Sequence, residues 1–160
     1  TDGDPWGGGE NTTGGGNDDD IDLTGKAGVE FTTLNGTKLL ALTCELADTQ
    51  EERAKGLMNR TELGQYEGMV FYYEPPREVA FWMKNTLIPL DMIFLDKTGT
   101  VKKVHSNAKP LDETPIMGGN GILAVLEING GLAGKIGITE GWQMRHPSFD
   151  KDTAAWPCDG

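Results

Sequence analysis

Residues 81–91 hold the densest group of side chains that could do chemistry. Trp82, Lys84, Asn85 and Asp91 fall within ten residues. An aromatic face, an ammonium, an amide and a carboxylate together are typical of a pocket for a small ligand, such as a sugar or a carboxylate. The alternative is structural: Lys84 and Asp91 form an ion pair, and Asn85 holds a turn through backbone hydrogen bonds.

Glu127 is a second candidate, because it interrupts an otherwise apolar run over 122–128. Alternation along a strand would place it on one face with Leu123 and Val125. A buried carboxylate needs a partner. The candidate partners are Arg53, Arg60 and Lys84. A structural ion pair is favoured over a catalytic carboxylate, and an enzyme that uses Asp91 or Glu127 as general acid or base stays an alternative.

No catalytic constellation or cofactor motif accompanies these residues in the sequence. There is no Gly-x-Ser-x-Gly nucleophile elbow and no phosphate-binding loop. His105 and the methionines could collect a soft metal such as Cu(I), but nothing fixes their spacing and core methionines are commoner. Cys44 and Cys158 lack zinc-site spacing, and either a disulfide between them or a buried Cys44 thiol fits. We therefore predict no metal and no cofactor.

Charge limits the choice of partners. The formal net charge is -11, and residues 1–22 carry seven acidic residues and no Lys or Arg. The remaining chain holds 14 basic against 18 acidic residues. Nucleic acid is a poor partner for such a chain, because binding its backbone needs a clustered basic surface. No segment approaches the roughly 18 apolar residues of a membrane span.

The elements that must position these residues are mostly short strands. The predicted strands cover residues 29–34, 38–46, 68–73, 79–83, 90–95, 100–106, 122–128 and 142–145. Asn35-Gly36 predicts a hairpin turn. Asp48 or Thr49 can cap one short helix that ends near Leu57. Residues 74–77 predict a turn, 109–121 a loop and 131–136 a helical turn. The fold class is therefore mainly β, a β-rich α+β domain built as a small barrel or strongly curled sheet.

The chain divides into three predicted parts. Residues 1–28 form a flexible leader rich in Gly and Asp, residues 29–146 form the domain and residues 147–160 form a C-terminal tail. Such a leader resembles the spacer after a removed signal peptide or a lipoprotein anchor. We therefore expect an extracellular or cell-envelope location.

The motifs resemble the bacterial and archaeal family called domain of unknown function 192. The matching stretches are Ala47-Asp48-Thr49, Glu52-Arg53, Gly56-Leu57-Met58, Arg60, Gly68-Met69-Val70-Phe71, Phe81-Trp82-Met83-Lys84-Asn85-Thr86, Ile88-Pro89-Leu90-Asp91-Met92-Ile93-Phe94 and Val125-Leu126-Glu127-Ile128. The resemblance implies a compact β-rich, barrel-like fold with a short helix and no established activity. It also implies signature positions at Arg53, Arg60, Trp82, Lys84, Asn85, Asp91 and Glu127.

Three functions follow as hypotheses. The first is a non-catalytic extracytoplasmic module for recognition or self-assembly, in which the leader packs on a neighbouring subunit of a homo-oligomer or filament. The second is a small-ligand domain with a pocket around Trp82, Lys84, Asn85 and Asp91, with the seven signature residues as its predicted ligand-binding set. The third is an uncharacterised enzyme, which the missing Ser, Cys or His beside Asp91 and Glu127 disfavours.

Overall fold

The computed structural model describes residues 26–32 and 38–145, with side chains described within 30–31 and 41–145. The predicted leader, the Asn35-Gly36 turn and the tail with Cys158 lie outside these residues. The strands are β1 (Lys26–Thr32), β2 (Lys38–Ala47), β3 (Glu67–Phe81), β4 (Leu90–Asp96), β5 (Val101–Ala108), β6 (Ile116–Asn129) and β7 (Gln143–Arg145). The two short helices are α2 (Gln50–Lys55) and α3 (Leu132–Ile136).

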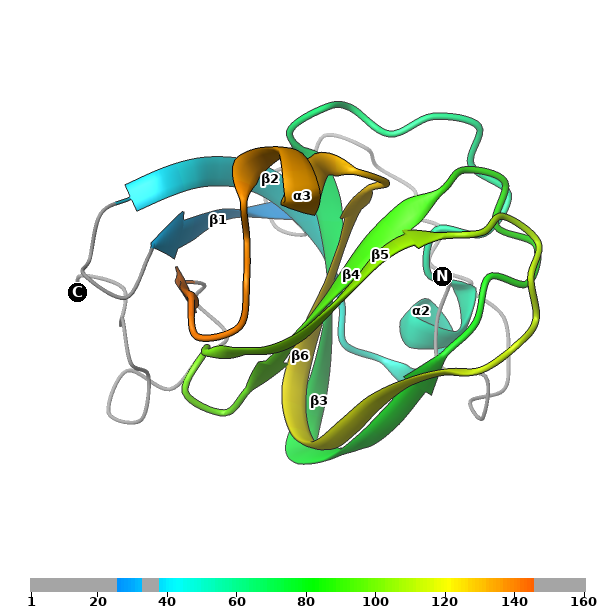
Figure 1. The fold of residues 1–160 in the computed structure, drawn as a ribbon. Helices are drawn as coiled ribbons and strands as arrows, with labels where there is room; N and C mark the ends of the chain where they lie inside the picture. The colour runs from blue at the N-terminus through cyan, green and yellow to red at the C-terminus, as the bar shows by residue number, and fades with distance from the viewer. Residues whose placement is uncertain (1–25, 33–37, 146–160) are drawn as a thin grey trace.

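The strands form one curled seven-stranded sheet in the order β5-β4-β6-β3-β2-β1-β7 (Figure 1). Among the described strands only β2 and β3 pair in parallel, and α2 lies in the crossover between them. The sheet curls until β7 meets the turn before β5. Thr100 and Gln143 form a bridge there, and the Val101 amide donates to the Trp142 carbonyl at 2.8 Å. The predicted barrel-like, strongly curled sheet is confirmed.

Two cores lie on opposite faces of the central strands, because alternate residues of a strand point to opposite faces. On β4, Ile93 and Leu95 enter the first core, whereas Met92 and Phe94 enter the second. Figure 1 shows α3 on the side of β1 and β2, and α2 across the central strands from it. The first core includes Leu132 and Ala133 of α3, and the second includes Leu57 from the segment after α2.

Local sequence signals account for α2. Thr49 is its N-cap, and the Thr49 hydroxyl accepts from the Glu52 amide at 3.1 Å while Glu52 accepts from the Thr49 amide at 3.1 Å. This capping box satisfies two amides that the helix leaves unpaired. Gly56 ends the helix at a φ of 49°. The predicted helix is confirmed.

The predicted turn at 74–77 is wrong, because β3 runs through it as one strand of 15 residues. Tyr72 pairs with Ala124 of β6, and the next pair is Arg77 with Ile122. The residues between them bulge out of the ladder, which is a place where prolines are tolerated because they donate no hydrogen bond.

The predicted loop over 109–121 is also wrong in its second half, because β6 begins at Ile116. Val79 pairs there with Gly119, and Phe81 pairs with Ile116. Gly118 lies against the Phe94 ring, so that the absence of a side chain at this position makes room for the second core.

Cys44 lies in the first core, where its side chain is 1% exposed and carries a free thiol. Burial, together with the carboxylates of Glu45 and Glu67, raises the pKa of this thiol to about 12. The thiolate is the reactive form of cysteine, so burial makes Cys44 less reactive at neutral pH than an exposed thiol.

Candidate functional site

The loop between β3 and β4 carries the predicted Trp82–Asp91 cluster. It is held by backbone bonds: the Thr86 amide donates to the Met83 carbonyl at 3.1 Å, and the Leu111 amide donates to the Thr86 carbonyl at 3.0 Å. The Asn85 carbonyl accepts from the Asn59 amide at 2.8 Å, and Asn85 itself has a φ of 55°. Asparagine tolerates this left-handed conformation better than most residues. The turn-holding alternative for Asn85 is therefore what the geometry supports.

Trp82 and Lys84 are brought together. The Lys84 ammonium lies 5.2 Å from the centroid of the Trp82 ring, within the range of a cation–π contact. The Trp82 indole nitrogen is buried and has no hydrogen-bond partner among the described residues.

Asp91 binds backbone amides, and the predicted ion pair between Lys84 and Asp91 is not formed. The carboxylate is fully buried and accepts three backbone N–H groups. Oδ1 accepts from Asn107 at 2.8 Å and from Gly131 at 2.9 Å, and Oδ2 accepts from Ala133 at 2.8 Å. Asp91 thus ties β4 to the end of β5 and to the start of α3.

Arg60 and Arg53 are engaged at separate places. Arg60 forms a two-pronged ion pair with Glu45, whose Oε1 accepts from Nη2 at 2.7 Å. Arg53 donates through Nη1 to the Asp48 carbonyl at 2.7 Å and to the Tyr72 carbonyl at 3.0 Å. Both arginines therefore join β2 or β3 to the helical segment between those strands.

Glu127 is fully buried on β6, where it pairs in register with Met69 of β3 and Met92 of β4. Alternation places it on the face of Val125, which packs in the second core. The expectation that Leu123 shares this face is wrong, because Leu123 packs in the first core. The alternation breaks where the pairing of β6 with β3 and β4 shifts register.

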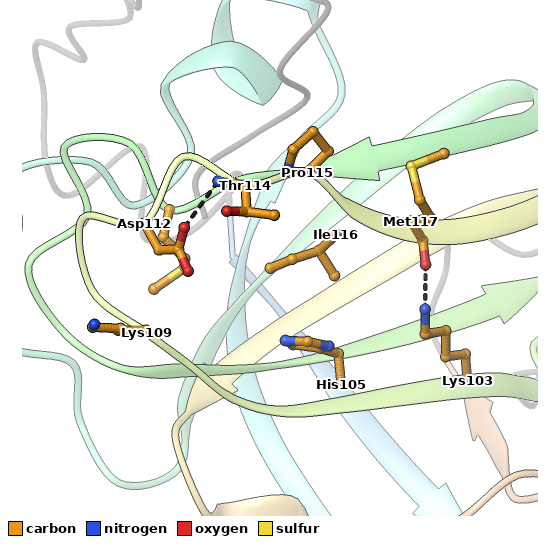
Figure 2. A pocket seen from close by; sticks show the side chains of 9 residues that line it. Lys103, His105, Lys109, Asp112, Thr114, Pro115, Ile116 and Met117 are labelled. Carbon is orange, nitrogen blue, oxygen red and sulfur yellow. Dashed lines mark hydrogen bonds between the residues drawn. The ribbon is translucent and has the colours of Figure 1, made fainter.

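A pocket of about 340 Å³ opens beside the loop between β3 and β4, and it lies between β5 and residues 112–117 (Figure 2). Its lining residues are Met83, Lys103, His105, Lys109, Asp112, Thr114, Pro115, Ile116 and Met117. None of the seven predicted ligand-binding residues is in this set, and ligand binding by those residues stays a prediction. The volume lies at the lower end of the range for small-molecule sites.

One wall of the pocket is basic. Figure 2 shows the His105 imidazole between Lys103 and Lys109, with Thr114, Pro115 and Ile116 across from it. The Lys103 ammonium donates to the Met117 carbonyl, which fixes its position.

Two titratable groups of the pocket are shifted. Burial first, and the Lys103 ammonium second, lower the pKa of His105, which the Asp91 carboxylate partly offsets. The Thr114 amide donates to Asp112 Oδ1 at 2.9 Å, which lowers the pKa of the Asp112 carboxyl. At neutral pH the imidazole is therefore mostly neutral and Asp112 is ionised.

The soft-metal alternative stays untested, and three of its candidate ligands, His105, Met83 and Met117, line this pocket. Met69 and Met83 are buried in the second core. The Met117 side chain points away from the His105 ring in Figure 2. Within the described residues no group of three or more His, Cys, Asp or Glu side chains could hold a metal ion.

A second pocket of about 390 Å³ lies between the segment after α2 and the start of α3. Asn129 lines it, and its side-chain amide donates to the carbonyls of Leu63 at 2.9 Å and Gly64 at 3.0 Å. Lys135 is the only charged residue among those that line it. This pocket has fewer groups that could recognise a charged ligand.

No helix in the described part of the chain is long and apolar enough to cross a membrane.

Comparison with known proteins places the chain in a family. The profile of the family described as "Uncharacterized ACR", DUF192, matches residues 31–146. A protein of unknown function from Novosphingobium aromaticivorans DSM 12444 is 48% identical, with a TM-score of 0.71 over 74% of this chain and 84% of its own. A candidate transcription regulator from Sinorhizobium meliloti 1021 is 36% identical, with a TM-score of 0.73 over 76% of this chain and 93% of its own. No curated protein matches the chain. The resemblance drawn from the sequence motifs is thereby confirmed, and the chain belongs to the DUF192 family.

Proposed function

We propose that this domain is a binding module for a small organic anion, held in the pocket between β5 and residues 112–117. The observation that carries the proposal is the basic wall of Lys103, His105 and Lys109 in a chain whose net charge is -11. The two lysines outnumber the one carboxylate of the pocket, Asp112, and this local excess of positive charge in a concave site attracts anions even where the whole protein repels them.

The opposite wall defines the rest of the ligand. Pro115 and Ile116 offer apolar surface, and Met83 adds a buried thioether. A carboxylate on a short hydrocarbon or aromatic body would place its charge on the lysines and its body against these side chains. The pocket volume of about 340 Å³ limits the ligand to a small molecule.

Binding fits the described geometry better than catalysis by the predicted carboxylates. Asp91 and Glu127 are both fully buried, and neither lines the pocket. The three backbone amides on Asp91 occupy both of its carboxylate oxygens.

The proposal predicts that the double variant Lys103→Met/Lys109→Met binds carboxylates at least about tenfold more weakly than the wild type. Hydrogen bonds to charged groups contribute about 1.5–3 kcal/mol each, and about 1.4 kcal/mol is a tenfold change. The measurement is isothermal titration calorimetry of the full chain with acetate, pyruvate, succinate and benzoate. Affinity should also fall as salt is added.

The matched control is Lys97→Met/Lys102→Met, which changes the net charge equally. Lys97 lies in the turn before β5, Lys102 is exposed on β5, and neither lines the pocket. The control should bind as the wild type does. Equal weakening of binding in both double variants would show that only the net charge matters, and would contradict a specific role for Lys103 and Lys109. A wild type that binds none of the four carboxylates would refute the proposal.

A further inference from the structure

His105 occupies the middle of the basic wall, where it can respond to the charge of a ligand. It lies on β5 between Lys103 and Lys109, and it lines the pocket with both of them (Figure 2). It is partly buried, whereas Lys109 is exposed. A group with these neighbours changes its charge when the charge inside the pocket changes.

The charged groups around the imidazole come from three places. Lys103 is on the same strand, Asp91 acts from the neighbouring β4, and Lys109 and Asp112 belong to the loop after β5. Ile116 and Met117 of β6 and Met83 of the loop after β3 also line the pocket, and they are uncharged. In the pocket without ligand, burial and the Lys103 ammonium therefore oppose a positive charge on His105, and the Asp91 carboxylate only partly offsets them.

We propose that the pocket takes up a proton together with its anion, and that His105 is the group that receives this proton. The inference rests on the proposed function. An anion beside the imidazole stabilises its charged form and offsets the repulsion from Lys103. The proton comes from solvent and goes to a ring nitrogen of His105. No other bond is made or broken.

The direction of the pH dependence follows from this exchange. His105 is mostly neutral in the empty pocket at neutral pH, because burial and Lys103 hold its pKa below the ordinary value. Binding that consumes a proton becomes tighter as pH falls, by at most about tenfold per pH unit for one proton. The affinity should level off once the empty pocket is itself protonated.

The test is calorimetric titration of the full chain with pyruvate and benzoate, between about pH 6 and pH 8, the range in which histidine titrates. Each titration is repeated in two buffers with different heats of ionisation, so that the proton count is obtained directly. The wild type should take up a fraction of a proton at neutral pH. His105→Gln should take up none, and its affinity should not change with pH.

The chain contains two histidines, so His146→Gln is a matched control that should retain the proton uptake. Proton uptake that survives in His105→Gln would overturn the inference, as would pyruvate or benzoate binding to the wild type without proton uptake. Both results would leave the proposed function standing. Absence of binding at every pH would instead remove the proposed function, and the inference with it.

Discussion

Asp91→Ala is expected to lower the free energy of unfolding by about 3–5 kcal/mol, because it leaves buried backbone donors unsatisfied. The wild-type carboxylate accepts the amides of Asn107, Gly131 and Ala133 at 2.8–2.9 Å. Alanine provides no acceptor for any of the three amides. A domain of this size is stable by only about 5–15 kcal/mol, so this loss removes a large share of its stability.

The measurement is urea denaturation followed by fluorescence, in which the midpoint falls in proportion to the lost stability. Asp91→Asn is the matched variant, because its amide keeps one oxygen of similar shape but turns an NH₂ toward a backbone donor. It should fall between Asp91→Ala and the wild type. A midpoint for Asp91→Ala close to that of the wild type would show that these three bonds do not hold α3 and β5 in place.

Gly118→Ala is expected to cost about 2–3 kcal/mol, because the second core has no space for the added methyl group. A Cβ built at Gly118 would lie 2.4 Å from two atoms of the Phe94 ring and 2.7 Å from Val79 Cγ2. Both side chains are fully buried, and Phe94 packs edge-on against Phe81 at 6.0 Å between ring centroids. The ring cannot move without disturbing this contact.

Gly134→Ala is the control for the glycine substitution. Gly134 lies within α3, and among the described residues nothing lies within 4 Å of its built Cβ. Alanine there should stabilise the chain by about 0.5–1 kcal/mol, because it lowers the entropy of the unfolded chain. If thermal or urea unfolding gave the two variants the same stability, tight packing at Gly118 would be disproved.

Sequence reasoning succeeded for the elements whose signals are local. The helix α2 depends on Thr49, Glu52 and Gly56, which lie within eight positions of one another. It failed where the partner is distant. Pro75 and Pro76 alone indicate a turn. They lie instead in a bulge of one long strand, because β6, more than 40 residues away, pairs with the residues on both sides of the bulge.

For the candidate site, too, sequence reasoning succeeded with local signals and failed where the partner is distant. The Trp82–Asp91 segment was found because its residue types are unusual together, yet Asp91 serves backbone amides that come from two remote segments. Lys103 and His105 alternate along a predicted strand, and that spacing was a signal of one shared face. The opposite wall at Pro115 and Ile116 comes from the segment read as an irregular loop. The packing of this segment opposite β5 depends on tertiary structure. Alternation along one strand does not predict which segment lies across from it.

Two predictions concern residues outside those that the structure describes. Self-assembly through the leader and an extracellular or cell-envelope location both depend on residues 1–28, of which only β1 from Lys26 onward is described. They stay predictions. Particle size with and without residues 1–22 would test the assembly, because large particles that vanish on truncation require the leader.

The curled sheet closes where Gln143 of β7 bridges Thr100, and we call this contact the seam. It has a consequence for how the domain folds. A three-residue strand joins Gln143 to Thr100 across more than 40 intervening residues, whereas β4 and β5 are joined by a short turn. Pairings between nearby segments form early, and the entropy of closing a long loop delays the distant ones. The β4–β5 hairpin should therefore be present in the folding transition state, and the seam should close after it. Substitutions at Gln143 would then speed unfolding and leave the folding rate unchanged, and the amides beside the seam would exchange with solvent through local opening before those of β6.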